Sequence, residues 1–123
     1  MSGAARSVAV FGVYCVGVGL ILIAGPNLLL GAVGLPPTGE AYVRVLGVVV
    51  LVLGLYYLAA ARAEAVAFFR WTTWGRPIAF ALFGVLVLLG VAPRVLILFG
   101  AVDAAGALWT ARALRRDAGL RVG

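Results

Sequence analysis

The chain of 123 residues is 65% hydrophobic and only 11% charged, and its mean hydropathy is +1.18. In a soluble domain about a quarter of all residues are charged. This composition therefore excludes an ordinary water-soluble fold and indicates an integral membrane protein. The net charge of +6 comes from ten arginines against four acids. Because the arginines lie at the ends of apolar segments, they favour a membrane interface over nucleic acid as partner.

Four apolar stretches are long enough to cross about 30 Å of hydrocarbon, which takes roughly 20 helical residues. They predict an all-α fold, a bundle of four transmembrane helices in a single integral membrane domain over residues 1–123. The expected helices cover about 7–30, 41–61, 74–92 and 94–114. The first apolar run is longer than that of a typical cleavable signal peptide, so we expect it to be retained.

Prolines and glycines mark the ends of these segments. Gly25-Pro26 interrupts the first helix because proline lacks an amide hydrogen and clashes with the preceding turn. The loop GLPPTGE at 34–40 separates the first and second spans. Pro77 is expected in the first turn of the third span, and Pro93 marks a tight reversal that pairs the third and fourth spans as a hairpin.

The distribution of arginine predicts the orientation of the bundle. With the N-terminus inside, Arg44 and Arg94 are the outer arginines. The inner arginines are then Arg6, Arg62, Arg70, Arg76, Arg112, Arg115, Arg116 and Arg121. The three tryptophans near the inner boundary and Tyr42 near the outer one agree with this assignment. The sequence therefore predicts an N-in/C-in, multi-pass protein of a bacterial inner membrane.

Asp103 is a carboxylate within the apolar run FGAVDAAGALW. An acid at the middle of a membrane helix costs about 2.5–3.5 kcal/mol on insertion scales, so it normally faces the bundle interior or water. Gly100, Ala104 and Ala107 share its helix face and form a stripe of small residues. This stripe predicts helix packing, because small residues let another helix approach closely.

The second span offers a matching face with Gly47 and Gly54. Spans two and four run in the same direction, so the depth of Asp103 falls between Arg44, roughly 10 Å above, and Tyr57, roughly 9 Å below. An arginine side chain extends several Å along a helix, which makes a contact between Arg44 and Asp103 feasible. We expect these three residues to form an intramembrane polar site.

Three roles for Asp103 remain open at this point. It acts as a structural pin that fixes helix register, as a proton or cation site at the midplane, or as a pairing group across an oligomer interface. If only hydrogen bonding matters, Asp103→Asn is tolerated whereas Asp103→Leu impairs assembly.

The segment RAEAVAFFRWTTWGR at 62–76 is expected to form the inner loop. Its aromatic rings are typical of the headgroup level, where guanidinium groups meet anionic lipid. The residues expected to contact lipid headgroups or a partner are Arg62, Arg70, Trp71, Trp74 and Arg76. Either the loop only sets the topology, or it holds a dedicated site for an anionic headgroup or other amphiphile. Glu64 is expected to pair with Arg62 or Arg70.

The inventory of catalytic side chains is small. The chain has no histidine and a single cysteine, Cys15, so it offers neither an intrachain disulfide nor a histidine-based zinc or haem site. No nucleotide-binding loop or catalytic triad pattern occurs. We therefore expect no metal, no cofactor and no catalytic residue, which favours a non-enzymatic protein.

Several segments together resemble a known group. They are AGPN (24–27), GLPPTGE (34–40), YVRVLG (42–47), LGLYYLAAAR (53–62), FFRWTTWGR (68–76) and the late Asp103. In this order they are similar to small bacterial integral membrane proteins near the DoxX-like four-helix group. The resemblance implies a four-helix membrane bundle. Better-known members are linked to quinone or sulfur redox systems, but this chain lacks the cysteines and histidines that such chemistry uses.

The leading hypothesis is a structural, accessory or lipid-interacting subunit of a bacterial inner membrane. Its expected partners are membrane lipids, anionic ones among them, and a second copy of the chain or another membrane protein, with no nucleic acid. The alternative is a small transporter or channel for protons, cations or an amphiphile, with Asp103 as its intramembrane site. A third class, an enzyme acting on a lipid or quinone headgroup, has little chemical support.

Overall fold

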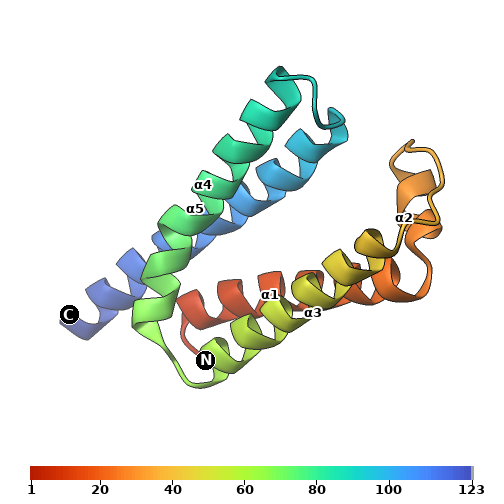
Figure 1. Cartoon of the computed structure of the whole chain (residues 1–123). Helices are drawn as coiled ribbons and strands as arrows, with labels where there is room; N and C mark the ends of the chain where they lie inside the picture. Colours follow the sequence, from red (N-terminus) through yellow and green to blue (C-terminus); the bar gives the residue numbers. More distant parts are fainter. Residues whose placement is uncertain (123) are drawn as a thin grey trace. The chain divides into compact units, whose positions relative to one another are not determined.

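The computed structural model describes the backbone of residues 1–122 and the side chains of residues 1–119. Within that range the chain is helical and has no β-strand (Figure 1). Its helices are α1 (Gly3–Ala24), α2 (Pro26–Ala32), α3 (Ala41–Arg62), α4 (Val66–Leu88) and α5 (Val95–Val122). All except the short α2 are long and apolar enough to cross a membrane. The predicted class, an all-α fold with four membrane-spanning helices, is confirmed for the described residues.

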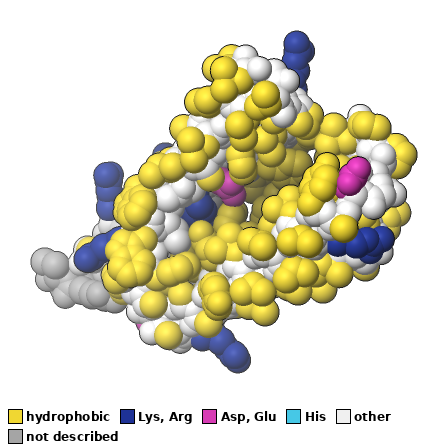
Figure 2. Space-filling model, viewed as in Figure 1, with side chains coloured by type: hydrophobic (Ala, Val, Ile, Leu, Met, Phe, Trp, Pro, Cys, Tyr) yellow, Lys and Arg dark blue, Asp and Glu magenta, His cyan; other side chains and the backbone are white. Residues whose placement is uncertain are grey.

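Large hydrophobic side chains cover much of the described surface. Along α3, Leu46, Val49 and Leu53 are between 42% and 59% exposed. Figure 2 shows hydrophobic side chains over most of the visible face, with the arginines mainly near helix ends. Such a surface is unfavourable in water and is expected where lipid tails are the solvent. The chain is therefore a multi-pass membrane protein.

The chain forms two compact units. The first unit comprises Met1–Val8 and Ala60–Gly123, and the second unit comprises Ala9–Ala59. The first turns of α1 accordingly belong with α4 and α5, and the rest of α1 belongs with α2 and most of α3. The sequence predicts one integral membrane domain over residues 1–123, and this stays a prediction. It did not include the division into two compact units.

In the second unit, α1 and α3 pack backbone against backbone at two glycine pairs. A Cβ atom added to Gly54 would lie 2.8 Å from the carbonyl oxygen of Gly12. A Cβ atom added to Gly47 would lie 2.9 Å from that of Gly19. Only residues without side chains allow such an approach, which maximises van der Waals contact between membrane helices. The neighbour of the Gly47 and Gly54 face is thus α1, whose glycines recur at the same spacing.

In the first unit, α4 and α5 form the hairpin that the sequence predicts (Figure 1). At the end of α4, the N–H group of Val91 donates to the carbonyl of Leu86 at 3.1 Å, and Gly90 has a φ of +75°. This is the usual left-handed helix ending, which glycine adopts without steric cost. Gly100 of α5 packs on α4, because a Cβ atom there would lie 2.7 Å from the Phe80 ring.

The predicted loop over 62–76 is wrong. α4 begins at Val66 rather than near Trp74, so only residues 63–65 connect α3 to α4. The arginines lower the hydropathy of this segment without preventing a helix, and the helix therefore begins before the most apolar stretch. Pro77 consequently lies inside α4 and not in its first turn. Membrane helices tolerate an internal proline because neighbouring groups satisfy the freed carbonyls.

Two further boundaries differ from the prediction. The first span does not continue to residue 30, because α1 ends at Ala24 and Pro26 begins the separate helix α2. The break falls at Gly25-Pro26, as predicted. α5 does not end near Leu114 but continues to Val122. Its last part is rich in alanine, leucine and arginine, which are strong helix formers, so the loss of apolar character does not end the helix.

Candidate functional site

Two acids satisfy the first turn of α1 in the first unit. The backbone N–H and the hydroxyl of Ser2 donate to the Glu64 carboxylate at 2.6 Å and 2.7 Å. The N–H groups of Gly3 and Ala4 donate to the Asp117 carboxylate at 3.3 Å and 3.0 Å. Helix N-termini leave such amides without intrahelical partners and favour negative charge.

These bonds bring three distant segments to one end of the first unit: the start of α1, the α3–α4 connection and the late part of α5. If four helices cross the membrane, both chain termini and the α3–α4 connection lie on the same side of it. The contacts between these three segments agree with that topology. Which side faces the cytoplasm stays a prediction. Of the arginines that carry it, the side chain of Arg121 lies outside the described residues.

Glu64 has an unusual backbone conformation for its role. Its φ is +50°, a left-handed conformation that costs a non-glycine residue about 1 kcal/mol or more. Its carboxylate accepts hydrogen bonds from Ser2. The predicted pairing of Glu64 with Arg62 or Arg70 is therefore wrong. The hydrogen bonds from the Ser2 hydroxyl and then from the Ser2 backbone lower the pKa of Glu64 below its ordinary value of 4.5.

We expect Glu64→Gln to weaken the attachment of the N-terminus at neutral pH. A lowered folded-state pKa contributes stability that is present above pH 4.5 and lost as the pH falls through the folded value. The difference between wild type and variant should therefore be present at pH 7 and vanish in strong acid. Hydrogen exchange of the first-turn amides of α1 measures it, and a difference independent of pH would contradict the role of the Glu64 charge.

A polar cluster is buried where α1, α4 and α5 meet in the first unit. It consists of Ser7, Thr72, Arg76 and Thr110, each at most 6% exposed. The Arg76 Nη2 atom donates to the Thr110 hydroxyl at 2.7 Å and to the Thr72 hydroxyl at 3.1 Å. The Thr110 and Ser7 hydroxyl oxygens are 2.7 Å apart. Thr110 is therefore the hub that links all three helices.

Proton counting shows that this polar cluster acts as a unit. Thr110 Oγ1 also lies 3.1 Å from the Gly106 carbonyl oxygen, and Ser7 Oγ lies 2.7 Å from that of Ala4. Each hydroxyl has one proton to donate. If Ser7 donates to Thr110, Thr110 donates to Gly106; if Thr110 donates to Ser7, Ser7 donates to Ala4. Either pattern fixes both hydroxyls together, so the bonds are cooperative.

Asp103 lies within electrostatic range of Arg76. It is half-buried on α5, seven residues before Thr110 and on the same helix face. Arg76 is the charged group that acts electrostatically on its carboxylate. Arg76 itself is the eleventh of the 23 residues of α4, about 15 Å from the helix start at 1.5 Å per residue. A guanidinium at that depth requires hydrogen bonds and a nearby opposing charge. The cluster provides the hydrogen bonds, and Asp103 is an acid within electrostatic range.

The other two members of the predicted intramembrane site lie in the second unit. Arg44 donates a hydrogen bond from its guanidinium to the Ile23 carbonyl. Tyr57 is buried, and its ring centroid lies 5.1 Å from that of Phe11 at an interplanar angle of 47°. Because Asp103 belongs to the first unit, its predicted association with Arg44 and Tyr57 stays a prediction.

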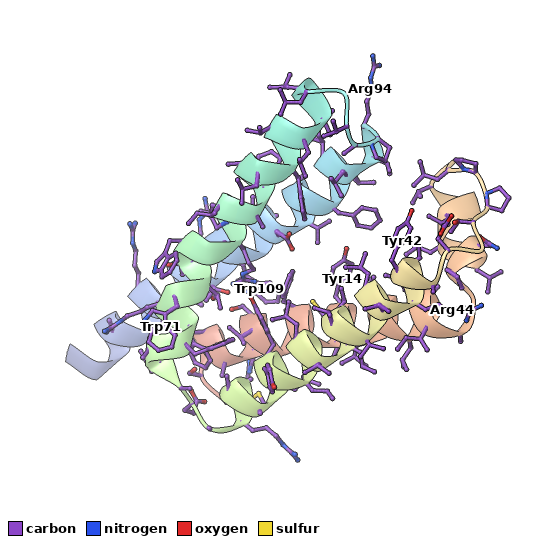
Figure 3. All side chains as sticks on the ribbon, viewed as in Figure 1. Tyr14, Tyr42, Arg44, Trp71, Arg94 and Trp109 are labelled. Carbon is purple, nitrogen blue, oxygen red and sulfur yellow. The ribbon has the colours of Figure 1, made fainter. Side chains whose placement is uncertain are left out.

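The predicted headgroup residues divide into two groups. Arg62, Arg70, Trp71 and Trp74 are exposed, and the Trp71 ring projects from α4 (Figure 3). Arg76 is buried in the polar cluster instead. The reason is helical: Phe69, Thr72 and Arg76 follow a spacing of three and four residues and share the inward face of α4. The prediction of a loop over 62–76 did not include this helical spacing. The sequence analysis therefore did not identify Thr72 as a buried polar residue, nor its partners Ser7 and Thr110 on other helices.

The small residues around Asp103 belong to the packed side of α5. Gly100 and Ala107 are buried, and Ala104 is half-buried. The contact between Gly100 and Phe80 makes α4 a neighbour of this stripe. Within the described residues, no group of three or more His, Cys, Asp or Glu side chains could hold a metal ion.

Comparison with known proteins adds no assignment. No family model, curated protein or solved structure matches the chain. Membership of the DoxX-like group stays a prediction.

Proposed function

We propose that this chain is a structural or accessory subunit of a bacterial inner membrane, related to the DoxX-like group. In this role the polar cluster and Asp103 fix α1, α4 and α5 in register. The observation that carries the proposal is the bonding of Arg76. Its guanidinium donates to hydroxyl groups on α4 and α5 and is opposed by the charge of Asp103.

The helices that these hydrogen bonds connect support a structural role. The hydrophobic effect does not drive helices together within lipid, so packing and interhelical hydrogen bonds determine the arrangement. Thr110 receives the Arg76 donor and is bonded to Ser7, so one residue of α5 specifies the position of both neighbours. A shift of α5 by one residue would break these bonds and leave the buried Arg76 with acceptors on α4 alone.

The surface supports contacts with membrane components. The exposed side chains of α3 suit lipid tails, a second copy of the chain or another membrane protein. The exposed Arg62, Arg70, Trp71 and Trp74 suit an interface with anionic headgroups. The proposed subunit is accordingly oligomeric or bound to a membrane partner, and it interacts with lipid.

A double-mutant cycle with Asp103→Asn and Arg76→Gln tests the proposal. Each single variant leaves one partly desolvated charge without its partner, so each should lower the free energy of unfolding in detergent. The double variant should lose less than the sum, with a coupling of about 1 kcal/mol or more. Because Asn removes the charge opposing Arg76, it should be less well tolerated than hydrogen bonding alone would predict. Additive losses would exclude a paired role.

Asp103→Leu gives the corresponding assembly measurement. Size-exclusion chromatography and native electrophoresis should show less assembled protein for Asp103→Leu than for Asp103→Asn, because leucine has no polar atom. A leucine variant with wild-type assembly and stability would sink the structural proposal.

A second candidate, a small transporter of protons or cations, is favoured by one observation. A half-buried carboxylate within electrostatic range of a buried arginine on the neighbouring helix is an arrangement found in proton relays. The same Asp103→Asn variant separates the two functions. Flux driven by a pH gradient in proteoliposomes, abolished by Asp103→Asn, would favour transport, and the absence of flux under any gradient would count against it.

A further inference from the structure

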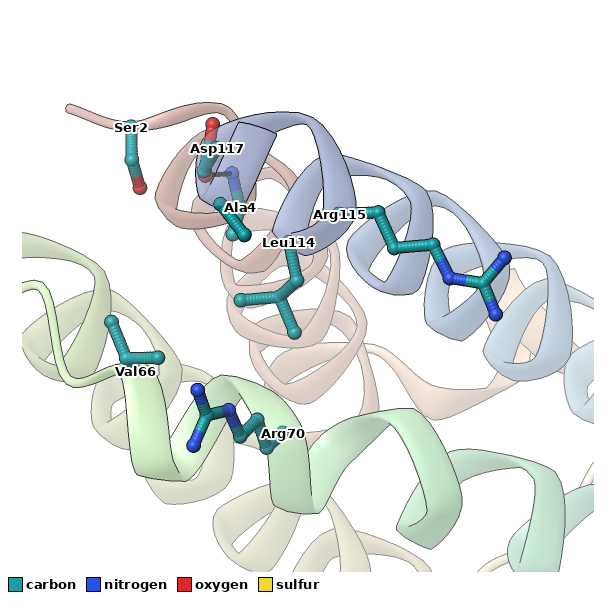
Figure 4. A pocket seen from close by; sticks show the side chains of 8 residues that line it. Ser2, Ala4, Val66, Arg70, Leu114, Arg115 and Asp117 are labelled. Atoms are coloured by element: carbon teal, nitrogen blue, oxygen red, sulfur yellow. Dashed lines mark hydrogen bonds between the residues drawn. The ribbon is translucent and has the colours of Figure 1, made fainter. Parts of the chain in front are cut away.

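A pocket of about 360 Å³ lies at the end of the first unit where α1 and α4 begin and α5 passes its last turns. Its walls include Ala4, Val66, Arg70, Leu114, Arg115 and Asp117 (Figure 4). The pocket is separate from the buried polar cluster, and none of the cluster residues lines it. It lies at the level where the ends of the apolar helices carry charged residues.

The walls combine two chemistries. Ala4, Val66 and Leu114 are apolar, and Leu114 points from α5 toward α4 (Figure 4). Arg70 and Arg115 are cationic, exposed, and contributed by different helices. Within the described residues, no hydrogen bond or ion pair engages either guanidinium. The Arg70 side chain is directed toward Val66, and the Arg115 side chain extends along α5 away from Leu114 (Figure 4). Two available cations on different sides of an apolar wall fit an amphiphile with an anionic head.

Asp117 is the acid in this pocket. Its carboxylate accepts the N–H groups of Gly3 and Ala4, so its charge is directed at the positive end of α1. The two arginines therefore leave the pocket with an excess of positive charge. Phosphate groups are bound well by guanidinium groups, which form two parallel hydrogen bonds to them.

We propose that this pocket binds one anionic phospholipid. Its phosphate lies at Arg70, Arg115 adds positive charge at the other side of the pocket, and its glycerol and first acyl carbons lie against Val66 and Leu114. This inference rests on the proposed membrane function and specifies its lipid partner. A phospholipid fits better than a free anion because its acyl chains contact the apolar walls, whereas inorganic phosphate has no apolar part to place there. It fits better than a protein segment because headgroup phosphates are abundant at this depth.

The test compares two lipids on the purified full chain in a neutral detergent. Short-chain phosphatidylglycerol and phosphatidylcholine with identical acyl chains are titrated, and native mass spectrometry counts the bound molecules. Wild type should bind one phosphatidylglycerol at least about tenfold more tightly than phosphatidylcholine. Arg70→Gln/Arg115→Gln should weaken phosphatidylglycerol binding roughly 30-fold, since each basic residue at a membrane surface contributes about fivefold.

The matched control is Arg6→Gln/Arg112→Gln. It removes two exposed arginines from the same unit, neither of which lines the pocket, and so changes net charge equally. Its affinity should fall by no more than about threefold, the size of a diffuse charge effect. Arg70→Lys/Arg115→Lys keeps the charge but not the paired hydrogen bonds, and should retain the preference for phosphatidylglycerol at reduced affinity.

Two results would overturn the proposal. Equal losses in the pocket and control variants would assign the preference to overall charge. Competition by glycerol 3-phosphate at the concentration that saturates the lipid would assign the site to a free anion. Thermal unfolding of each variant verifies its fold. The Asp103 and Arg76 cycle tests the structural function without altering the pocket, so either idea can fail alone.

Discussion

Gly19→Ala is expected to lower the free energy of unfolding of the second unit by about 2 kcal/mol. A Cβ atom at this position would lie 2.6 Å from the backbone nitrogen of Leu51 and 2.7 Å from the carbonyl oxygen of Gly47. Both are backbone atoms, which cannot rotate away as a side chain does. α1 and α3 would have to separate, and the contacts along their glycine pairs would weaken together.

Gly17→Ala is the matched control on the same helix. A Cβ atom there meets nothing within 4 Å, so only the helix propensity changes. Alanine is the better helix former by about 0.5–1 kcal/mol, and this variant should be as stable as wild type or slightly more stable. Unfolding in mixed detergent and SDS, followed by circular dichroism, measures both variants. Equal effects at the two positions would mean that α1 and α3 do not pack through Gly19.

Thr110→Val is expected to destabilise the first unit by about 2 kcal/mol. Valine preserves the shape of threonine but removes the hydroxyl that is bonded to Ser7 and accepts from Arg76. Single interhelical hydrogen bonds in membrane proteins average only about 0.6 kcal/mol. The effect of Thr110→Val should be larger, because one of the lost bonds involves the buried guanidinium of Arg76. Arg76 and the Ser7 hydroxyl stay buried after losing the Thr110 hydroxyl.

Thr73→Val serves as its control. Thr73 is on α4 beside the cluster residue Thr72, and its hydroxyl donates only to the Arg70 carbonyl of its own helix. The same chemical change should therefore cost well under 1 kcal/mol. The same detergent unfolding assay applies. A loss at Thr110 no greater than at Thr73 would show that the polar cluster adds nothing to stability beyond ordinary helical hydrogen bonds.

Local properties of the sequence were sufficient for the fold class. Length and hydropathy identify each membrane-spanning helix because a helix satisfies its own backbone within one segment, whatever its neighbours. The break at Gly25-Pro26 and the hairpin at Pro93 were also predictable, because proline and glycine act on the adjacent turn. Where hydropathy alone was used, as for the start of α4 and the end of α5, the boundaries were wrong by about two turns.

The partners of each helix face required the tertiary structure. Small residues mark Gly47 and Gly54 as a packing face, but a stripe of this kind fits any other stripe of the same spacing. Only the structure shows that its neighbour is α1. Asp103 was identifiable as an interior acid because its cost in lipid depends on its own segment. The cation within its electrostatic range in the first unit is Arg76, which the sequence pattern assigns to the interface.

The sequence by itself thus determined that this is a multi-pass helical membrane protein with an acid that needs a partner. Hydropathy, helix length and the cost of a buried charge are all properties of one segment in lipid. The tertiary structure decided which hydroxyl groups and which arginine satisfy one another, and which glycines touch. Those contacts join Ser7 to Thr110 and Arg76 to Thr110, residues 103 and 34 positions apart. Such pairings depend on how whole helices rotate and pack, which no local pattern specifies.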